Sequence, residues 1–189
     1  MGSLRIVAGT LKGRRIRVLD VAGLRPTPDR AREALFDILG HDLSGFRVLD
    51  AFAGTGALGI EALSRGAASA AFVESDRKVS DALRGTLREL GLDARSCVVV
   101  APADAATLSR LAGGPFDLVL ADPPYAAAPL REGFLRGLVA SPGRLAPLVR
   151  IAIERESRGA PTAPPSGLAW VRTARYGRTS FDFYARSPL

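Results

Sequence analysis

The sequence contains very few of the residues on which cysteine or histidine chemistry depends. Cys97 is the only cysteine and His41 the only histidine among 189 residues. One cysteine cannot form an internal disulfide or a four-cysteine metal site, and one histidine leaves little for a zinc site or a Ser-His-Asp triad. We therefore expect no metal centre, with His41 in a surface loop and Cys97 inside the hydrophobic core.

Long apolar segments are also missing. No run of about 18 apolar residues could cross a membrane, and no basic start is followed by the apolar core of a secretion signal. Hydrophobic residues nevertheless make up 47% of the chain and charged residues 24%, which is typical of a globular rather than a disordered protein. We expect a cytoplasmic protein with one full core and no membrane partner.

Acidic residues are scarce at both ends of the chain, so the net charge of +7 is unevenly distributed. Residues 1–32 contain eight Arg or Lys and two Asp, and residues 170–189 contain four Arg and one Asp. Of the 26 basic residues 24 are arginine, whose guanidinium forks onto phosphates and stacks on bases. A general bias toward arginine would explain the number, but the concentration at the ends favours a surface that faces nucleic acid.

Hydrophobic periodicity predicts a hairpin and a helix ahead of an α/β domain. Alternation at 4–8 and 14–19 predicts two strands with one basic face. Thr27 as N-cap and Pro28 at the first helical position predict a helix that stops at Gly40. From residue 46 strands and helices alternate: the expected strands are 47–51, 70–74, 97–101, 117–121, 149–153, 168–175 and 179–185, and the expected helices are 57–65, 76–90, 104–111 and 129–140.

This order of elements predicts the fold class. Continuous apolar runs at 98–100 and 118–120 are typical of parallel strands buried on both faces. The expected architecture is a doubly wound, Rossmann-like α/β fold whose mostly parallel seven-stranded sheet ends in an antiparallel hairpin turning at Gly177. Residues 1–45 form a basic extension and residues 46–189 the main domain in this interpretation.

A glycine turn joins the first strand of the main domain to its helix. Asp50 ends the strand, and Gly54 and Gly56 let the backbone turn sharply and approach a ligand. Glu74 ends the next strand, where a carboxylate can accept hydrogen bonds from two ribose hydroxyls, and Asp104 beyond the third strand can accept from an adenine amino group or cap a helix. These acidic groups at successive strand ends describe an adenosine-containing ligand.

A second cluster, Asp122-Pro123-Pro124-Tyr125, follows the fourth strand of the domain. The prolines fix the directions of the Asp122 and Pro123 carbonyls, so this segment is either a rigid turn or a site. As a site it suits methyl transfer to the exocyclic amine of a base. The Asp122 carboxylate and the Pro123 carbonyl accept the two N–H bonds while Tyr125 stacks on the ring. A sulfonium methyl donor is already activated and needs no metal.

These residues resemble those of a known family. Asp50 to Gly56 followed by Asp122 to Tyr125 is similar to the S-adenosylmethionine-dependent amino-methyltransferases of class I fold. The string from Phe52 to Ala67, with Arg5-Ile6-Val7-Ala8-Gly9 and the segment from Arg25 to Phe36, resembles the RsmD family. Members of that family methylate N2 of a guanine in small-subunit (16S) ribosomal RNA. The resemblance runs from about residue 4 to about residue 185.

The resemblance implies a role for each part of the site. Catalysis falls to Asp122, Pro123, Pro124 and Tyr125, and S-adenosylmethionine binding to Asp50, Phe52, Ala53, Gly54, Thr55, Gly56, Glu74, Asp104 and Asp122. RNA contacts fall to Lys12, Arg14, Arg15, Arg25, Arg30, Arg32 and Arg178. The partner is 16S ribosomal RNA within the small subunit or an assembly intermediate, and the protein is expected to be a monomer.

Three other interpretations remain open from the sequence. A DNA adenine-N6 or cytosine-N4 methyltransferase uses a similar tetrapeptide, although 189 residues leave little room for a target-recognition domain. The glycine spacing at 54, 56 and 59 also matches a nicotinamide-dependent oxidoreductase, but the basic ends and Asp122 would then have no purpose. A non-catalytic RNA-binding protein on the same fold is the third alternative.

Overall fold

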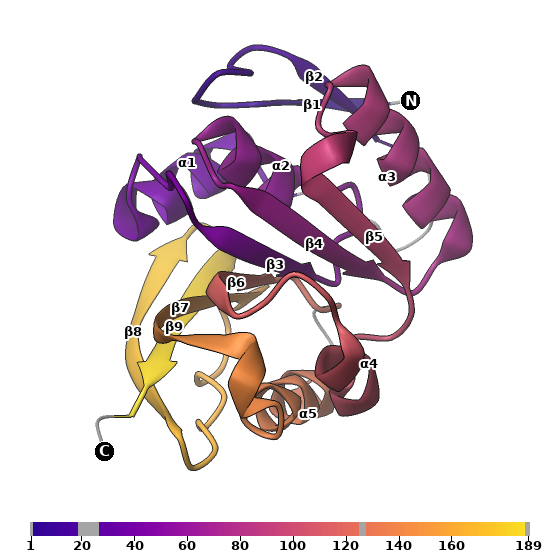
Figure 1. Cartoon of the computed structure of the whole chain (residues 1–189). Helices are drawn as coiled ribbons and strands as arrows, with labels where there is room; N and C mark the ends of the chain where they lie inside the picture. Colours follow the sequence, from indigo (N-terminus) through magenta and orange to yellow (C-terminus); the bar gives the residue numbers. More distant parts are fainter. Residues whose placement is uncertain (1, 19–26, 125–127, 188–189) are drawn as a thin grey trace.

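The computed structural model describes residues 2–18, 27–124 and 128–187. Its centre is a seven-stranded sheet with the order β5-β4-β3-β6-β7-β9-β8 (Figure 1). The five strands from β3 to β7 are parallel, and β9 and β8 add an antiparallel hairpin at one side, which confirms the predicted fold class. The strands are β3 (Arg47–Ala51), β4 (Ser69–Glu74), β5 (Ser96–Val100), β6 (Phe116–Ala121), β7 (Leu145–Glu156), β8 (Leu168–Tyr176) and β9 (Thr179–Arg186).

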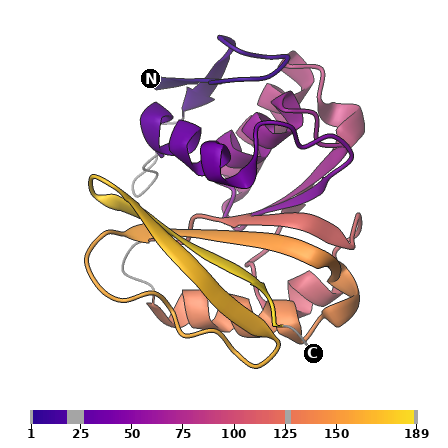
Figure 2. The same ribbon diagram turned by 90° about the vertical axis from the view of Figure 1, so that its left-hand side faces the viewer.

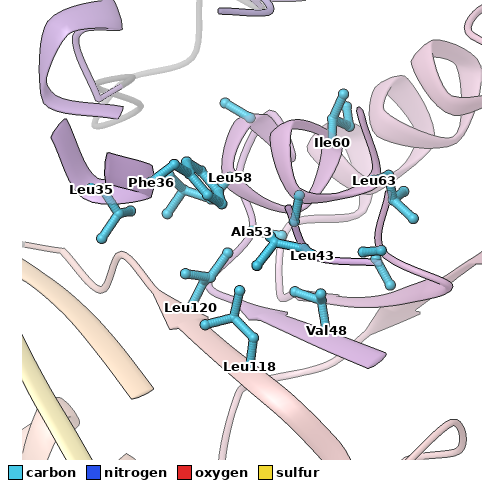
Figure 3. Close-up of a cluster of buried hydrophobic side chains, with 14 of the residues drawn as sticks. Leu35, Phe36, Leu43, Val48, Ala53, Leu58, Ile60, Leu63, Leu118 and Leu120 are labelled. Atoms are coloured by element: carbon cyan, nitrogen blue, oxygen red, sulfur yellow. The ribbon is translucent and has the colours of Figure 1, made fainter. Parts of the chain in front are cut away.

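Helices cover both faces of the sheet, as Figure 2 shows from the side. Each face has its own cluster of buried hydrophobic side chains, because strands buried on both faces must pack on two layers. Figure 3 shows part of one cluster, in which side chains of α1 and α2 lie over β3 and β6. One layer consists of α1 (Asp29–Leu39), α2 (Ala57–Ser64) and α3 (Arg77–Glu89), the other of α4 (Ala105–Arg110) and α5 (Ala128–Val139), with short 3-10 turns at Asp93–Arg95 and Pro142–Arg144.

A separate antiparallel hairpin, β1 (Gly2–Arg5) and β2 (Arg15–Val18), lies on the α1–α2 layer (Figure 1). Ile6 and Ile16 are buried in the same hydrophobic cluster as these helices. The Glu61 carboxylate of α2 accepts hydrogen bonds from the amides of Val7 and Ala8, at 2.8 and 2.9 Å. The basic N-terminal segment is therefore packed onto the α/β body through a shared hydrophobic core and buried hydrogen bonds.

Gly9 allows the tip of this hairpin to approach α2 closely. Its φ is +79°, and a Cβ atom at this position would lie 1.9 Å from the carbonyl oxygen of Ser64. The amides of Thr10 and Leu11 donate to the Ser64 carbonyl and hydroxyl, at 2.8 and 3.0 Å. Only glycine fits between the hairpin and the last residue of α2.

Four local predictions are wrong. The first strand covers Gly2–Arg5 and not 4–8, because its pairing with β2 starts at Gly2. Pro28, not Thr27, is the N-cap of α1, because the Thr27 hydroxyl donates to Glu154 at 2.5 Å. Cys97 is exposed, because β5 is an edge strand. Strand β7 spans Leu145–Glu156 and not only residues 149–153, because pairing with β9 extends as far as Glu156. No helix in the described parts of the chain is long and apolar enough to span a membrane.

Candidate active site

The parallel strands β3 to β7 all end at one edge of the sheet, called here the carboxyl edge. The turn after β3 passes through three left-handed residues, with φ values of 58° at Phe52, 53° at Gly54 and 75° at Gly56. Phe52 is the only non-glycine residue with positive φ in the described chain, and its ring packs edge-on against Phe134 with 5.5 Å between centroids. Phe52, in the predicted cofactor turn, thus adopts a backbone conformation that is unfavourable for residues with a side chain.

Two glycines of the spacing at 54, 56 and 59 have packing reasons. A Cβ atom on Gly56 would lie 2.4 Å from Leu83, and one on Gly59 would lie 2.4 Å from Phe72. The absence of side chains at Gly56 and Gly59 therefore allows α2 to pack closely on the sheet and on α3. The spacing that also matches nicotinamide-binding proteins is explained here by turn geometry and helix packing.

Asp50 lies beneath the glycine turn and is 1% exposed. Its Oδ2 accepts the Gly59 amide at 2.8 Å. Burial raises the pKa of Asp50 to about 8; the Gly59 hydrogen bond opposes this rise and the charge of Glu74 adds to it. The residue is therefore a carboxyl group whose charge depends on what binds above it.

Glu74 links the turn to the end of β4. Its Oε2 accepts the Gly54 amide at 2.9 Å, and its Oε1 accepts the Asp76 amide at 2.8 Å. Glu74 is half-buried. Oε1 also accepts the Ser75 hydroxyl at 3.4 Å. Both carboxylate oxygens are fixed in direction, and Oε2 keeps a lone pair for another donor.

Asp104 caps α4, as one of its two predicted roles required. Its Oδ1 accepts the Thr107 amide at 2.9 Å, and hydrogen bonds from Thr107 lower its pKa. The side chain is exposed beyond the end of β5. The capping bond uses one carboxylate oxygen, and the contact with adenine stays a prediction.

The Asp122-Pro123-Pro124 segment follows β6, next to β3. The Asp122 amide donates to the Ala51 carbonyl at 3.4 Å, which places the segment beside the start of the glycine turn. Asp122 is half-buried, Pro123 buried and Pro124 exposed. Tyr125 lies outside the described residues. Burial raises the pKa of Asp122 well above its ordinary value, and the neighbouring charges of Glu154 and Asp50 raise it further.

Glu154 is a site residue that the sequence analysis missed. Residues Ala121 and Ile153 are paired in the β6–β7 register, so Asp122 and Glu154 follow them on adjacent strands. Glu154 is 1% exposed, and its carboxylate accepts the hydroxyls of Thr27 and Thr179, at 2.5 and 3.4 Å. A lone acidic residue after the apolar run from 151 to 153 was the available signal.

Arg32 corrects the predicted RNA surface. Its side chain is 0% exposed, and its guanidinium donates to the Thr27 carbonyl at 2.8 Å, the Asp29 carboxylate at 3.0 Å and the Arg5 carbonyl at 2.5 Å. A cation enclosed in this way joins the hairpin to α1 and does not reach RNA. Arg30, two residues earlier, is exposed, and Arg25 lies outside the described residues.

The other predicted RNA residues are exposed but lie at opposite ends of the molecule. Arg14 donates to the Glu89 carbonyl at 2.8 Å, so it lies at the end of α3, about 20 Å along that 13-residue helix from the carboxyl edge. Lys12 lies in the hairpin tip against the last residue of α2, with Arg15 at the start of β2. Arg178 lies in the β8–β9 turn, where its carbonyl accepts the Ser157 amide at 2.8 Å beyond β7.

Two further basic residues that the sequence analysis did not select lie close to the β8–β9 turn. Glu156, Thr179 and Tyr176 are paired across β7, β9 and β8, so this turn reaches the carboxyl edge. Arg175, near the end of β8, and Arg158, two residues beyond β7, are exposed, as is Arg178 in the turn itself. We call these three residues the turn arginines.

No group of three or more His, Cys, Asp or Glu in the described residues is arranged to hold a metal ion.

The fold and its carboxyl edge define a class I methyltransferase fold. A structure described as a putative methyltransferase (yhhF) from Escherichia coli matches with a TM-score of 0.84 at 37% identity, covering 98% of each chain. A putative methylase from Haemophilus influenzae matches at 0.79 and 29% identity, covering 98% of this chain and 99% of that one. An RNA methyltransferase from Salinibacter ruber, solved with S-adenosyl-L-homocysteine, shares the fold at 0.60 and 16% identity, covering 86% and 94%.

Sequence relatives identify the family. The family described as "Conserved hypothetical protein 95" matches residues 4–185. "Ribosomal RNA small subunit methyltransferase D" of Escherichia coli K12 is 38% identical over 98% of this chain and 91% of its own length, and that of Haemophilus influenzae is 33% identical over 97% and 94%. The chain belongs to this family, the RsmD family, which confirms the resemblance seen in the sequence.

Proposed function

We propose that this protein transfers a methyl group from S-adenosylmethionine to the exocyclic N2 of a guanine in 16S ribosomal RNA. The observation that carries the proposal is the placement of Asp122-Pro123-Pro124 beside the glycine turn, with the Asp122 amide 3.4 Å from the Ala51 carbonyl. A cofactor turn and a base-binding segment thus share one edge of the sheet. The names of the curated relatives supply the class of RNA.

The residues at this edge suit S-adenosylmethionine. Glu74 Oε2 keeps a lone pair for a ribose hydroxyl, and the Ser75 hydroxyl on Oε1 can give way to a second one. Asp104 would accept from the adenine amino group, and the turn from Phe52 to Gly56 would hold the methionine end. The bound cofactor supplies a methyl group activated by its sulfonium. The positive charge of a cofactor bound next to Asp50 would favour the ionised carboxylate, whose pKa is raised to about 8, mainly by burial.

The target amine is held by acceptors and not by a nucleophile-activating histidine. The Asp122 carboxylate and the Pro123 carbonyl each accept one N–H of the amino group. This arrangement favours the pyramidal nitrogen whose lone pair is available for the methyl carbon. The ring of Pro123 fixes its φ and the following Pro124 restricts its ψ to extended values, so the Pro123 carbonyl keeps its direction. Tyr125 completes the pocket by stacking on the base in this proposal.

RNA approaches the carboxyl edge over the turn arginines and Arg30. The target base leaves its helix or loop to enter the pocket, as in other enzymes that act on bases. The basic hairpin, with Lys12, Arg14 and Arg15, contacts RNA farther from the target in this proposal. An extended footprint of this kind suits a substrate as large as the small ribosomal subunit, which one protein molecule binds as a monomer.

The first experiment identifies the methylated product. The protein is incubated with methyl-labelled S-adenosylmethionine and, in parallel, unmethylated small subunits, naked 16S ribosomal RNA or duplex DNA. The products are digested to nucleosides and identified by mass. Label in N2-methylguanosine is the expected result. Label in DNA adenine or cytosine would contradict the substrate, and cofactor binding without label in any arm would contradict the activity.

Asp122→Asn tests the assigned catalytic role. Asparagine keeps the shape of the side chain but removes the negative charge, so we expect turnover to fall by about a hundredfold or more with cofactor affinity changed severalfold at most. Glu132→Gln, an exposed charge change in α5, is the matched control. Equal losses of turnover and cofactor affinity in Asp122→Asn would remove Asp122 from the base-binding site.

A further inference from the structure

Three carboxyl groups form a row on the α1–α2 face of the sheet at the carboxyl edge. Asp50 is paired with Leu120 across β3 and β6, and Leu120 is paired with Ala152 across β6 and β7. Asp122 directly follows Ala121, the last residue of β6, and Glu154 directly follows its partner Ile153. Since side chains alternate along a strand, we infer that Asp122 and Glu154 have the orientation of Leu120 and Ala152, and the charge of Glu154 does act on Asp122.

Glu154 is held in place by two hydroxyl groups from opposite sides. Thr27, at the entry to α1, donates at 2.5 Å, and Thr179, at the start of β9, donates at 3.4 Å. Hydrogen bonds donated to a carboxylate favour its charged form. Both threonines are buried, with exposed fractions of 4%. The two contacts therefore fix the position of the Glu154 carboxyl group next to Asp122.

The charge of the Glu154 carboxylate raises the pKa of Asp122. Among the described residues, the titratable groups that face Asp122 are Glu154 from β7 and Asp50 from β3, and both raise its pKa in addition to burial. Glu154 has the larger effect of these two carboxylates. A carboxylate with a raised pKa is a stronger base, and a base works best when its pKa lies near the working pH.

We propose that Glu154 is a positioning residue that makes Asp122 the acceptor of the proton released from the guanine amino group. This inference rests on the proposed function. After methylation the nitrogen carries a positive charge and an N–H bond toward Asp122. That bond breaks, its electron pair stays on nitrogen, and the proton forms an O–H bond with the Asp122 carboxylate before passing to solvent. Glu154 touches neither base nor cofactor and acts only through Asp122.

Titration of Asp122 tests the inference without catalysis. The carboxyl carbon of Asp122 is followed by NMR in the full-length protein labelled at aspartate, with Asp122→Asn to assign the signal. Glu154→Gln removes the charge but keeps an acceptor for Thr27, so we expect the pKa of Asp122 to fall by about one unit. Glu156→Gln removes an exposed charge from the same strand and is expected to leave the Asp122 titration unchanged.

The pH dependence of methylation tests the same residue in the reaction. We expect activity to rise with pH as Asp122 ionises, and the Glu154→Gln variant to move this acid limb to lower pH by the NMR shift, with a lower plateau and unchanged cofactor affinity. Thr27→Val and Thr27→Ser provide a second pair if Glu154→Gln does not fold. Thr27→Val should shift the acid limb of the pH–activity profile because it removes the hydroxyl that donates to Glu154. Thr27→Ser keeps this hydroxyl and should show the wild-type profile.

The NMR and activity results test the role of Glu154 and the proposed function separately. An unchanged Asp122 titration in Glu154→Gln overturns the inference, and so does an NMR shift without any change in the acid limb. A matched shift in both supports it. Absence of methylation by the wild-type protein on every RNA overturns the proposed function instead, while the NMR result still shows whether Glu154 controls the proton affinity of Asp122.

Discussion

Asp50 carries a pH dependence that belongs to a single residue. Its pKa is raised to about 8 by burial, whereas an unfolded chain releases this proton near 3.8. Between these values the folded state binds more protons than the unfolded state. The free energy of unfolding therefore decreases as pH rises, by up to about 1.4 kcal/mol for each pH unit.

Asp50→Asn should flatten this dependence. The asparagine oxygen still accepts the Gly59 amide, and no charge develops as pH rises, so we expect the variant to be more stable than the wild type at pH about 8 and similar at pH about 4. Urea unfolding at several pH values measures the difference. Asp104→Asn is the control, because its pKa is lowered and the group stays ionised over this range. Parallel stability curves for Asp50→Asn and wild type would contradict the assignment.

Arg30 and Arg32 form a matched pair on α1. Arg32 is enclosed and holds Thr27, Asp29 and Arg5, so we expect Arg32→Ala to reduce the free energy of unfolding by about 3 kcal/mol, as for other broken buried ion pairs. Arg30→Ala removes an exposed charge and should change stability by less than about 0.5 kcal/mol while weakening RNA binding. Chemical unfolding and RNA titration distinguish them; equal effects of the two variants on stability would show that Arg32 is not structural.

At the scale of elements, the hairpin β1–β2 depends on one glycine contact. Alanine at position 9 would place its Cβ atom 1.9 Å from the Ser64 carbonyl and strain a φ of +79°. We expect Gly9→Ala to detach the hairpin tip and reduce stability by about 2 kcal/mol or more. Gly13→Ala has a similar φ of +87° but meets nothing within 4 Å, so it should show the strain alone, about 1 kcal/mol.

Hydrogen exchange at Thr10 and Leu11 measures the detachment directly. Their amides donate to Ser64, so Gly9→Ala should expose them to exchange while the core strands stay protected. Protection of these amides in Gly9→Ala equal to that in Gly13→Ala would mean that the close approach to α2 does not hold the hairpin.

At the scale of the whole molecule, basic residues lie both at the carboxyl edge and at the hairpin end. We expect Arg175→Gln with Arg178→Gln to weaken binding to RNA fragments and whole subunits alike. Lys12→Gln with Arg15→Gln should weaken binding to the whole subunit but not to a short fragment that contains the target base. Each lost phosphate contact lowers the salt dependence of log K by about 0.7 to 0.9. Identical effects of the two pairs on short fragments would contradict this extended footprint.

The order of elements, the parallel sheet and the residues at its strand ends could all be predicted from the sequence. Asp50 and Glu74 lie at the ends of apolar strands, and Asp104 and Asp122 come after such strands. Parallel strands bring these ends to one edge whatever the details of packing. The family resemblance was also visible, because the strings around Gly54 and Asp122 combine turn geometry with a base-binding tetrapeptide.

Which charges are enclosed, and which neighbours they contact, depends on tertiary packing. Arg32 and Arg30 look alike in the sequence, but the carbonyls that enclose Arg32 come from Thr27 and Arg5, and the second of these lies on a different element. The role proposed for Glu154 depends on the neighbouring strand β6 and on hydroxyls 127 and 25 residues away. Such contacts between distant segments form when elements pack, and local periodicity carries no record of them.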